Sequence, residues 1–419
     1  MSGTRNVDSW LTARRLLAHA ALLGVALWSI YIWTLATPGL RDRNGNLKGT
    51  DFLHFYTLGA LADGHRGADL YRVSAQTALA SQRVPQSAGI RYLPLYPPQV
   101  SLLFAPLATL PYVWALALWW FAGAFIYFAC CYLVWRASGN LRQHRATAIL
   151  AALAFPAFFN LIAWGQTSAL ALLCFTALFF ALRGRHEFVA GLVLGCLIFK
   201  PQLGLAAAVV FLAIGAWKIV LGAILSASAQ LGIGILYYGM SPLRQWMRIL
   251  WNVPALSQWL EPRPYQTHSL RTFWSMIVPW SAVSAVLYVI TGILVLSATI
   301  SLWRHRSDVP LAVRYSALLL TTVLVAPHLT VYDLVILAPA FLLLTDWLIQ
   351  QKSVKSGIGT LLYLVYVLPL LAPLTRWTHV QLSVIAMAAL LYVLWRISRR
   401  NSKVPGNFTQ MQPSEAATL

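Results

Sequence analysis

Four side chains that can carry chemistry stand out in this 419-residue sequence, and three of them border or interrupt its apolar runs. Asp51 lies in a long loop, Gln166 and His328 stand at the ends of apolar runs, and Lys200 divides two of them. An ionisable group at membrane depth is costly and usually faces a cavity. A carboxylate beside a histidine can accept a proton, and fixed cations stabilise a departing anion. These residue types therefore indicate an active or binding site.

The elements that must position these residues are membrane helices. The sequence is 59% hydrophobic and only 10% charged, which is too little charge to cover a water-facing surface. A soluble enzyme is therefore excluded, as is disorder, which needs low hydrophobicity and high charge. The net charge of +20 is spread as short basic clusters between apolar runs, a pattern typical of membrane topology rather than of nucleic-acid binding. The sequence predicts an all-α polytopic membrane protein.

The cysteines indicate neither a disulfide scaffold nor a zinc site. They lie inside apolar runs, and no histidine stands near them at zinc-ligand spacing. Core packing is the favoured interpretation for all four, which are Cys130, Cys131, Cys174 and Cys196.

Twelve apolar runs are long enough to cross a membrane or to lie inside a helical bundle. The two runs on either side of Lys200-Pro201 are short and alternatively form one kinked helix, so we expect about 10–12 spans. The first run is too long for a cleavable signal and has no small-residue cleavage site after it. The predicted runs are residues 16–38, 112–135, 146–159, 167–182, 188–199, 203–215, 218–238, 281–302, 313–326, 333–350, 358–372 and 380–397.

The basic residues predict the orientation. The short basic turns 136–145, 183–187, 304–314 and 352–355 all fall on the side of the N-terminus, which places both termini in the cytoplasm of a plasma (inner) membrane. Residues 1–400 are then one integral membrane domain, and 401–419 are a disordered cytoplasmic tail. The opposite face, towards the periplasm or exterior, collects the unusual polar residues: Asp42, Asp51, Asp63, Asp69, Gln166, Lys200, Glu261, His268, Arg271, His328, Asp333 and Arg376.

The long outer loop 39–111 is expected to be structured. Aromatic and apolar residues at helical spacing predict an interfacial helix after Asp51, with Thr50 or Asp51 as its N-cap. Many prolines around a short apolar run predict a re-entrant or interfacial hairpin over 91–111. A second interfacial stretch is expected over 241–267, where Trp and Arg suit the headgroup layer and a simple membrane anchor is the favoured interpretation.

An ordered set of motifs resembles glycosyltransferase family 87, over about residues 15 to 345. This family includes polyprenol-phosphate-mannose-dependent mannosyltransferases that act on phosphatidylinositol mannosides. The motifs are Thr50-Asp51-Phe52 with Tyr56, Tyr96-Pro97-Pro98 with Pro106 and Pro111, Gly165-Gln166, Ala190-Gly191 with Phe199-Lys200-Pro201-Gln202, and Pro327-His328 with Tyr332-Asp333.

The resemblance implies a C-type glycosyltransferase fold with an outward-facing active site. It further implies a polyprenyl-phosphate-linked sugar donor, an inverting reaction and no metal or other cofactor. The family's acidic base maps onto Asp51, and the histidine that partners it maps onto His328. Other enzymes of this fold carry paired acids in the first loop, whereas here Asp42 is nine residues from Asp51, which argues against metal assistance.

The remaining site residues follow from what glycosyl transfer needs. Fixed cations should surround the leaving phosphate, and Lys200, Arg271 and His268 are the candidates. Sugars stack on aromatic rings and bond to polar groups, which a further set can supply: Tyr56, Tyr92, Tyr96, Trp164 and Gln166. The expected function is transfer of a hexose, with mannose favoured, to a lipid or glycan acceptor. Membrane lipids are expected to surround the protein, and nucleic acid is not an expected partner.

Several of these residues, and the function itself, have alternative interpretations. Asp51 is alternatively only a helix cap, Lys200 a lysine that reaches for the interface, and Gln166 a helix-start hydrogen bonder. For Asp333 we favour capping, and His54 and His65 are expected on the surface. A transporter or lipid-linked-sugar flippase is the alternative function, although no internal repeat supports it. A non-catalytic scaffold would not need these polar residues at one face.

Overall fold

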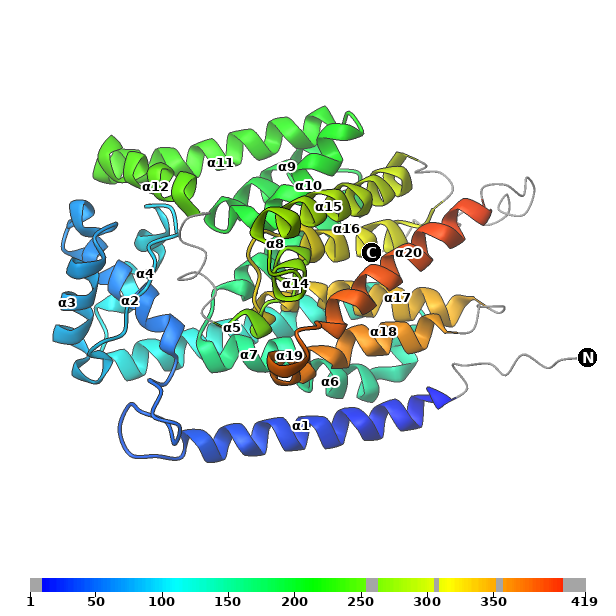
Figure 1. The fold of residues 1–419 in the computed structure, drawn as a ribbon, viewed down its shortest axis with the longest axis horizontal. Helices are drawn as coiled ribbons and strands as arrows, with labels where there is room; N and C mark the ends of the chain where they lie inside the picture. The colour runs from blue at the N-terminus through cyan, green and yellow to red at the C-terminus, as the bar shows by residue number, and fades with distance from the viewer. Residues whose placement is uncertain (1–9, 254–262, 305–308, 352–356, 402–419) are drawn as a thin grey trace, which may run out of the picture.

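The computed structural model describes residues 10–253, 263–304, 309–351 and 357–401. Within them the chain is built from α-helices and short 3-10 helices (η), with two isolated β-bridges. The long helices run roughly parallel to one another (Figure 1). The first half contains α1 Ala13–Leu35, α2 Thr50–Asp63, α3 Val73–Arg83, α4 Val100–Ala108, α5 Tyr112–Ala137, α6 Arg145–Leu153, α7 Pro156–Trp164, α8 Ser168–Arg183, α9 Glu187–Gly195 and η5 Cys196–Phe199.

The second half continues the bundle. Its helices are α10 Pro201–Ala213, α11 Trp217–Tyr238, α12 Met240–Asn252, α14 Leu270–Ile277, α15 Ser281–Arg304, α16 Leu311–Val325, η8 Val331–Leu337, α17 Ala338–Gln350, α18 Ile358–Val367, α19 Ala372–Thr378 and α20 Leu382–Asn401.

The predicted all-α polytopic membrane fold is confirmed. In the described ranges seven helices are long and apolar enough to cross a membrane, and the bent pair that α6 and α7 form makes an eighth candidate. Four shorter apolar helices, namely α8, α9 with η5, α10 and α16, cover the other predicted runs. The break at Lys200-Pro201 is present, because η5 ends at Phe199 and α10 begins at Pro201.

The run predicted as one span over 146–159 differs from expectation. It is two helices bent by 43°, and the second extends to Trp164. Pro156 is the first residue of α7 and has no backbone N–H to continue the hydrogen bonds of α6. The apolar pattern alone does not register this break.

Two apolar cores stabilise the molecule. The larger one lies in the bundle and is formed chiefly by α5, α7, α8, α10, α16, α17 and α20. The smaller one packs α2, α3, α4 and the first half of α5 against one another. The side chains of Trp120 and Phe199 pack against both cores and so join the long loop to the bundle. In Figure 1 this second unit forms one end of the molecule, away from the N-terminus.

The long loop is more buried than an interfacial helix would be. All residues of α2 from Phe52 to Ala62 are buried, so α2 is enclosed by protein on nearly every side. Residues 91–111 form an irregular segment followed by the single helix α4, which packs on α2, instead of a hairpin. In the second predicted interfacial stretch, Trp246 is buried and its Nε1 donates to the Leu95 carbonyl at 2.8 Å, whereas Trp251 is 87% exposed.

Other expectations fall on residues that lie outside the described ones. These include the tail 402–419, Trp259 in the second interfacial stretch, and Glu261.

Candidate functional site

Asp51 lies in the first turn of α2 but does not cap the helix. The N-cap is Gly49, whose φ of +65° lies in the left-handed region that favours glycine. Neither Thr50 nor Asp51 caps the helix, because the Thr50 hydroxyl donates to the Leu47 carbonyl at 2.6 Å and the N-cap makes no side-chain bond. The predicted N-cap is therefore wrong, and the carboxylate of Asp51 is available for contacts across the fold.

Gln166 is the side chain that meets Asp51. Its Nε2 donates to Asp51 Oδ2 at 2.6 Å. The preceding Gly165 ends α7 with a φ of +70°, and a Cβ there would lie 2.8 Å from the Phe52 Cβ, so the turn fits against α2 only with glycine. Trp119 Nε1 donates to the Gly165 carbonyl at 3.0 Å and fixes the turn. Gln166 is therefore more than a helix-start residue.

Lys200 forms the charged centre of the site. Its Nζ lies 2.8 Å from Asp333 Oδ1, donates to Ser168 Oγ at 3.0 Å and approaches Gln166 Oε1 at 3.4 Å. The ammonium also faces the Tyr332 ring at 5.3 Å. Lys200 is 4% exposed and is paired, so a lysine reaching for the membrane interface is ruled out.

Asp333 has two roles at once. The predicted capping is confirmed, since Thr330 N donates to Asp333 Oδ2 at 3.3 Å in a capping box that starts η8. Its other oxygen binds Lys200 and accepts from the Ser168 hydroxyl at 2.5 Å. Neither Ser168 nor the ion pair of Lys200 with Asp333 was predicted from the sequence. The one indication of a role for Ser168 is its position two residues after Gln166.

A continuous hydrogen-bonded chain results, which we call the polar relay: Asp51, Gln166, Lys200, Ser168 and Asp333. It joins turns from four distant parts of the sequence. At its open end Asp51 is half-buried, whereas the other members are almost fully buried.

Burial raises the pKa of Asp51 to about 6. The hydrogen bond from Gln166 and the charges of Lys200 and His328 lower it, and the carboxylate of Asp333 raises it. A carboxyl group with this pKa is largely ionised at neutral pH and is basic enough to accept a proton.

His328 lies close enough to Asp51 for its charge to lower the pKa of that carboxyl group. The pairing of His328 with the acid stays a prediction. His328 is half-buried. Arg271 flanks it, because Arg271 Nη1 donates to the Pro327 carbonyl at 3.1 Å.

His268 is a poor cation. It is 1% exposed, and its Nδ1 lies 2.8 Å from the Ser383 hydroxyl. Burial lowers its pKa to about 4, so the imidazole is neutral at neutral pH. A neutral ring brings no positive charge to a phosphate, but its Nε2 has no hydrogen-bond partner among the described residues, and phosphate binding by His268 stays a prediction.

The predicted aromatic residues divide into two groups. Tyr56 is buried in the smaller core, and its hydroxyl donates to the Leu110 carbonyl at 2.8 Å, which indicates a structural role. Tyr92 and Tyr96 are half-buried beside the polar relay, and burial raises the pKa of each hydroxyl. Trp164 is half-buried at the end of α7, two residues before Gln166.

The two histidines expected on the surface behave differently. His65 is exposed and stacks on Tyr237 at 5.1 Å. His54 is instead 4% exposed, because α2 is covered by the segment 91–99 and by α4.

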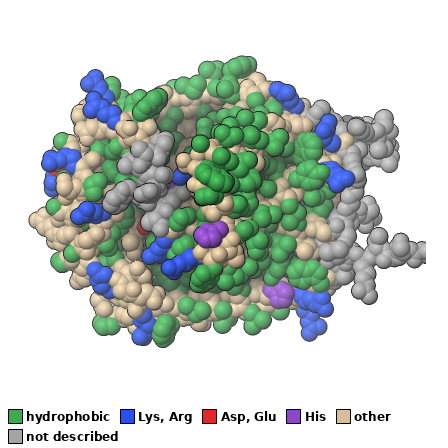
Figure 2. Space-filling model, in the orientation of Figure 1, with side chains coloured by type: hydrophobic (Ala, Val, Ile, Leu, Met, Phe, Trp, Pro, Cys, Tyr) green, Lys and Arg blue, Asp and Glu red, His purple; other side chains and the backbone are tan. Residues whose placement is uncertain are grey.

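The face drawn in Figure 2 carries Lys, Arg and His side chains around a hollow in front of the bundle. A cavity of about 970 Å³ lies elsewhere. It is lined mainly by apolar residues of α1, α6, α17 and α18, and none of the predicted site residues lines it. His19 and His144 are part of its lining, but none of the carboxylates of the polar relay, nor Lys200, reaches it.

Within the described ranges, no group of three His, Cys, Asp or Glu side chains comes together as a metal-binding cluster. The acids of the relay are bonded to amide, hydroxyl and ammonium donors.

Comparison with known proteins identifies one family. A model described as glycosyltransferase family 87 matches residues 95–327, which is more than half of the chain. The matched part contains Gln166, Ser168 and Lys200, whereas Asp51 precedes it and Asp333 follows it. No curated protein and no solved structure matches the chain.

Proposed function

This chain belongs to glycosyltransferase family 87 and is a multi-pass membrane protein, and on that premise we propose that it transfers a hexose from a polyprenyl-phosphate donor to a lipid or glycan acceptor. Mannose is the sugar we favour. The observation that carries the proposal is the half-buried Asp51 carboxylate, held by Gln166 at 2.6 Å and supported by the polar relay behind it.

In the proposed reaction Asp51 is the base. Its carboxylate takes the proton of the acceptor hydroxyl while that oxygen bonds to the anomeric carbon and the bond from this carbon to the phosphate oxygen breaks. Attack opposite the phosphate inverts the anomeric centre. The electron pair leaves with the polyprenyl phosphate, and a positioned base contributes about 10²–10⁴-fold to such a step.

The cations of the site have different parts in this proposal. The Lys200 ammonium has three donors, and Asp333, Ser168 and Gln166 all lie within reach of it. This arrangement supports Lys200 as a positioning residue that holds Gln166 against Asp51. Arg271, half-buried beside His328, is our proposed cation for the leaving phosphate.

The proposed location of the site is the non-cytoplasmic side of the plasma membrane. The helices α2, α3 and α4 of the long loop, with Asp51 in the first turn of α2, lie at one end of the molecule, and the N-terminus lies at the other (Figure 1). The short basic turns between helices support a cytoplasmic position for the end that carries the N-terminus.

The experiment that tests the function is transfer from a panel of radiolabelled polyprenyl-phosphate sugars in purified membranes containing EDTA. Transfer that persists in EDTA supports a metal-independent transferase and identifies the sugar. A folded protein that transfers nothing across broad donor and acceptor panels, yet moves lipid-linked sugar between leaflets, would establish the flippase alternative.

The rate of transfer should depend on pH through Asp51. Because the base must be ionised, kcat/KM is expected to be high at neutral pH and to fall as the pH drops through about 6. Gln166→Leu removes a hydrogen bond that lowers the pKa of Asp51, so its midpoint should move to higher pH. Initial rates between pH 5 and 8 measure both profiles. Identical midpoints in the two proteins would contradict the assignment of Asp51.

A further inference from the structure

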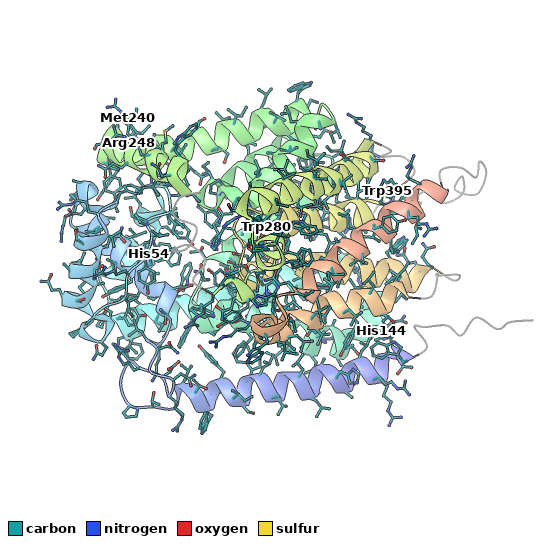
Figure 3. The ribbon with its side chains drawn as sticks, in the orientation of Figure 1. His54, His144, Met240, Arg248, Trp280 and Trp395 are labelled. Atoms are coloured by element: carbon teal, nitrogen blue, oxygen red, sulfur yellow. The ribbon has the colours of Figure 1, made fainter. Side chains whose placement is uncertain are left out.

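His54 is a buried imidazole without a hydrogen bond. It lies on α2 three residues after Asp51, a spacing that places both side chains on one side of the helix. The ring is 4% exposed, and neither Nδ1 nor Nε2 has a hydrogen-bond partner. Figure 3 shows His54 at the end of the molecule that the long loop forms. Buried polar groups in folded proteins almost always find a partner, so an unpaired one at this position calls for an explanation.

The rings beside His54 belong to Phe55, Tyr92 and Tyr96, and they leave both of its nitrogens unpaired. The Tyr92 ring centroid lies 5.0 Å away and the Tyr96 ring centroid 5.8 Å away. The Tyr92 hydroxyl donates to the Thr50 carbonyl and is already engaged. Both tyrosines also border the polar relay, because the charge of Asp51 acts on each. Tyr92 and Tyr96 therefore lie beside both the unpaired imidazole and the polar relay.

The charge state of His54 limits what it can bind. Burial lowers its pKa to about 3, so the ring is neutral at physiological pH. A neutral imidazole has one donor nitrogen and one acceptor nitrogen. A sugar hydroxyl also donates and accepts, whereas a phosphate oxygen at neutral pH mainly accepts and is better served by a cation.

We propose that His54 binds a hydroxyl of the sugar substrate and is a positioning residue for the transfer. This inference rests on the proposed function and adds to it a contact on the side of α2 that carries Asp51. The sugar reaches His54 when Tyr92 and Tyr96 move aside. Both belong to the segment 91–99, which has no helix or strand, so their displacement leaves the helices intact and breaks two local bonds, from the Tyr92 hydroxyl to the Thr50 carbonyl and from the Tyr71 hydroxyl to the Tyr96 carbonyl.

His54→Phe tests the proposal, because it separates binding from folding. Phenylalanine fits an aromatic environment and removes the unpaired nitrogens, so the Tm of the purified protein should stay the same or rise. The KM for the best sugar substrate of the panel should rise about tenfold, the cost of one lost hydrogen bond, while kcat changes less. A merely structural histidine would change Tm without changing KM.

Two further variants make the result decisive. Thr322→Val on α16 removes another buried, unpaired side-chain group, and it should keep or raise Tm and leave KM unchanged. His54→Gln keeps an amide donor and acceptor and should recover part of the lost affinity. A folded His54→Phe protein with the wild-type KM overturns the proposal. If His54→Phe does not fold, a folded His54→Gln protein with the wild-type KM overturns it equally.

The two proposals fail in different ways. A wild-type protein that transfers no sugar counts against the function itself. In that case the rise in Tm caused by each polyprenyl-phosphate sugar is compared between wild type and His54→Phe, and equal rises, including none in either protein, overturn the role of His54. A wild-type protein that transfers sugar with the same KM as His54→Phe counts against His54 alone.

Discussion

Replacing Asp51 by asparagine is expected to lower the transfer rate by about 10²–10⁴-fold while the protein remains folded. Asparagine has the same shape and still accepts the hydrogen bond from Gln166, but it cannot take a proton from the acceptor hydroxyl. Single-turnover transfer from the donor that the panel identifies measures the loss. Wild-type transfer by the folded variant would contradict the role of Asp51 as the base.

Stability should move in the opposite direction to activity in this variant. Burial raises the folded-state pKa of Asp51 to about 6, above its ordinary value of 3.8. The fold therefore disfavours the ionised form, so the stability that the protonated group contributes is lost as the pH rises from 3.8 to about 6 and is absent at neutral pH. Asparagine removes that charge, so Tm at pH 7 should be unchanged or higher than that of the wild type.

Asp63→Asn is the matched control. Asp63 is the last residue of the same helix and is exposed. The substitution again replaces a carboxylate by an amide, but at the other end of α2 from Asp51. The Asp63→Asn protein is therefore expected to have wild-type activity.

Lys200→Gln is expected to cause the largest loss of stability among the variants considered, about 3–5 kcal/mol. The change leaves the Asp333 carboxylate, 2% exposed, without its ion-pair partner at 2.8 Å. Denaturant or thermal unfolding in detergent measures the loss. The double variant Lys200→Gln/Asp333→Asn removes both charges and should recover most of the stability, so the cycle isolates the pair.

The activity of the double variant separates folding from positioning. If Lys200 acts through Gln166, the restored fold should still transfer sugar slowly, with a shifted pH profile. An exposed ion pair of the long loop is the control, because Arg66 is 44% exposed in its contact with Asp69. Arg66→Met should change stability by only about 0–1 kcal/mol. A Lys200→Gln protein as stable as the wild type would contradict the buried pair.

The helices of this protein were largely predictable from the sequence. Membrane-length apolar runs form helices because every backbone polar group must be satisfied within the segment. The break between the two short runs at Lys200 was also predictable, because Pro201 has no backbone N–H to continue the preceding helix. The bend at Pro156 was missed, because neighbouring apolar residues masked it.

The site was predictable only as a set of residue types at one face. The sequence indicated Asp51, Gln166, Lys200 and Asp333 individually, because polar groups at the ends of apolar helices are costly and so stand out. It did not show which of them bond. Lys200 and Asp333 are 133 residues apart, and Gln166 is 115 residues from Asp51, so no local pattern relates them.

The tertiary structure also decided which residues are accessible. His54 looked like a surface residue because burial depends on the chain that folds over α2, namely 91–99 and α4, and not on the residues beside it in sequence. Tyr56 and His268 were assigned to the substrate by type, and only the structure shows that they bond to the Leu110 carbonyl and the Ser383 hydroxyl. Composition and periodicity determined the membrane helices, because these depend on local hydrophobicity. The packing of distant turns decided which side chains bond to one another and how deeply Asp51 is buried, and this burial raises the pKa of Asp51.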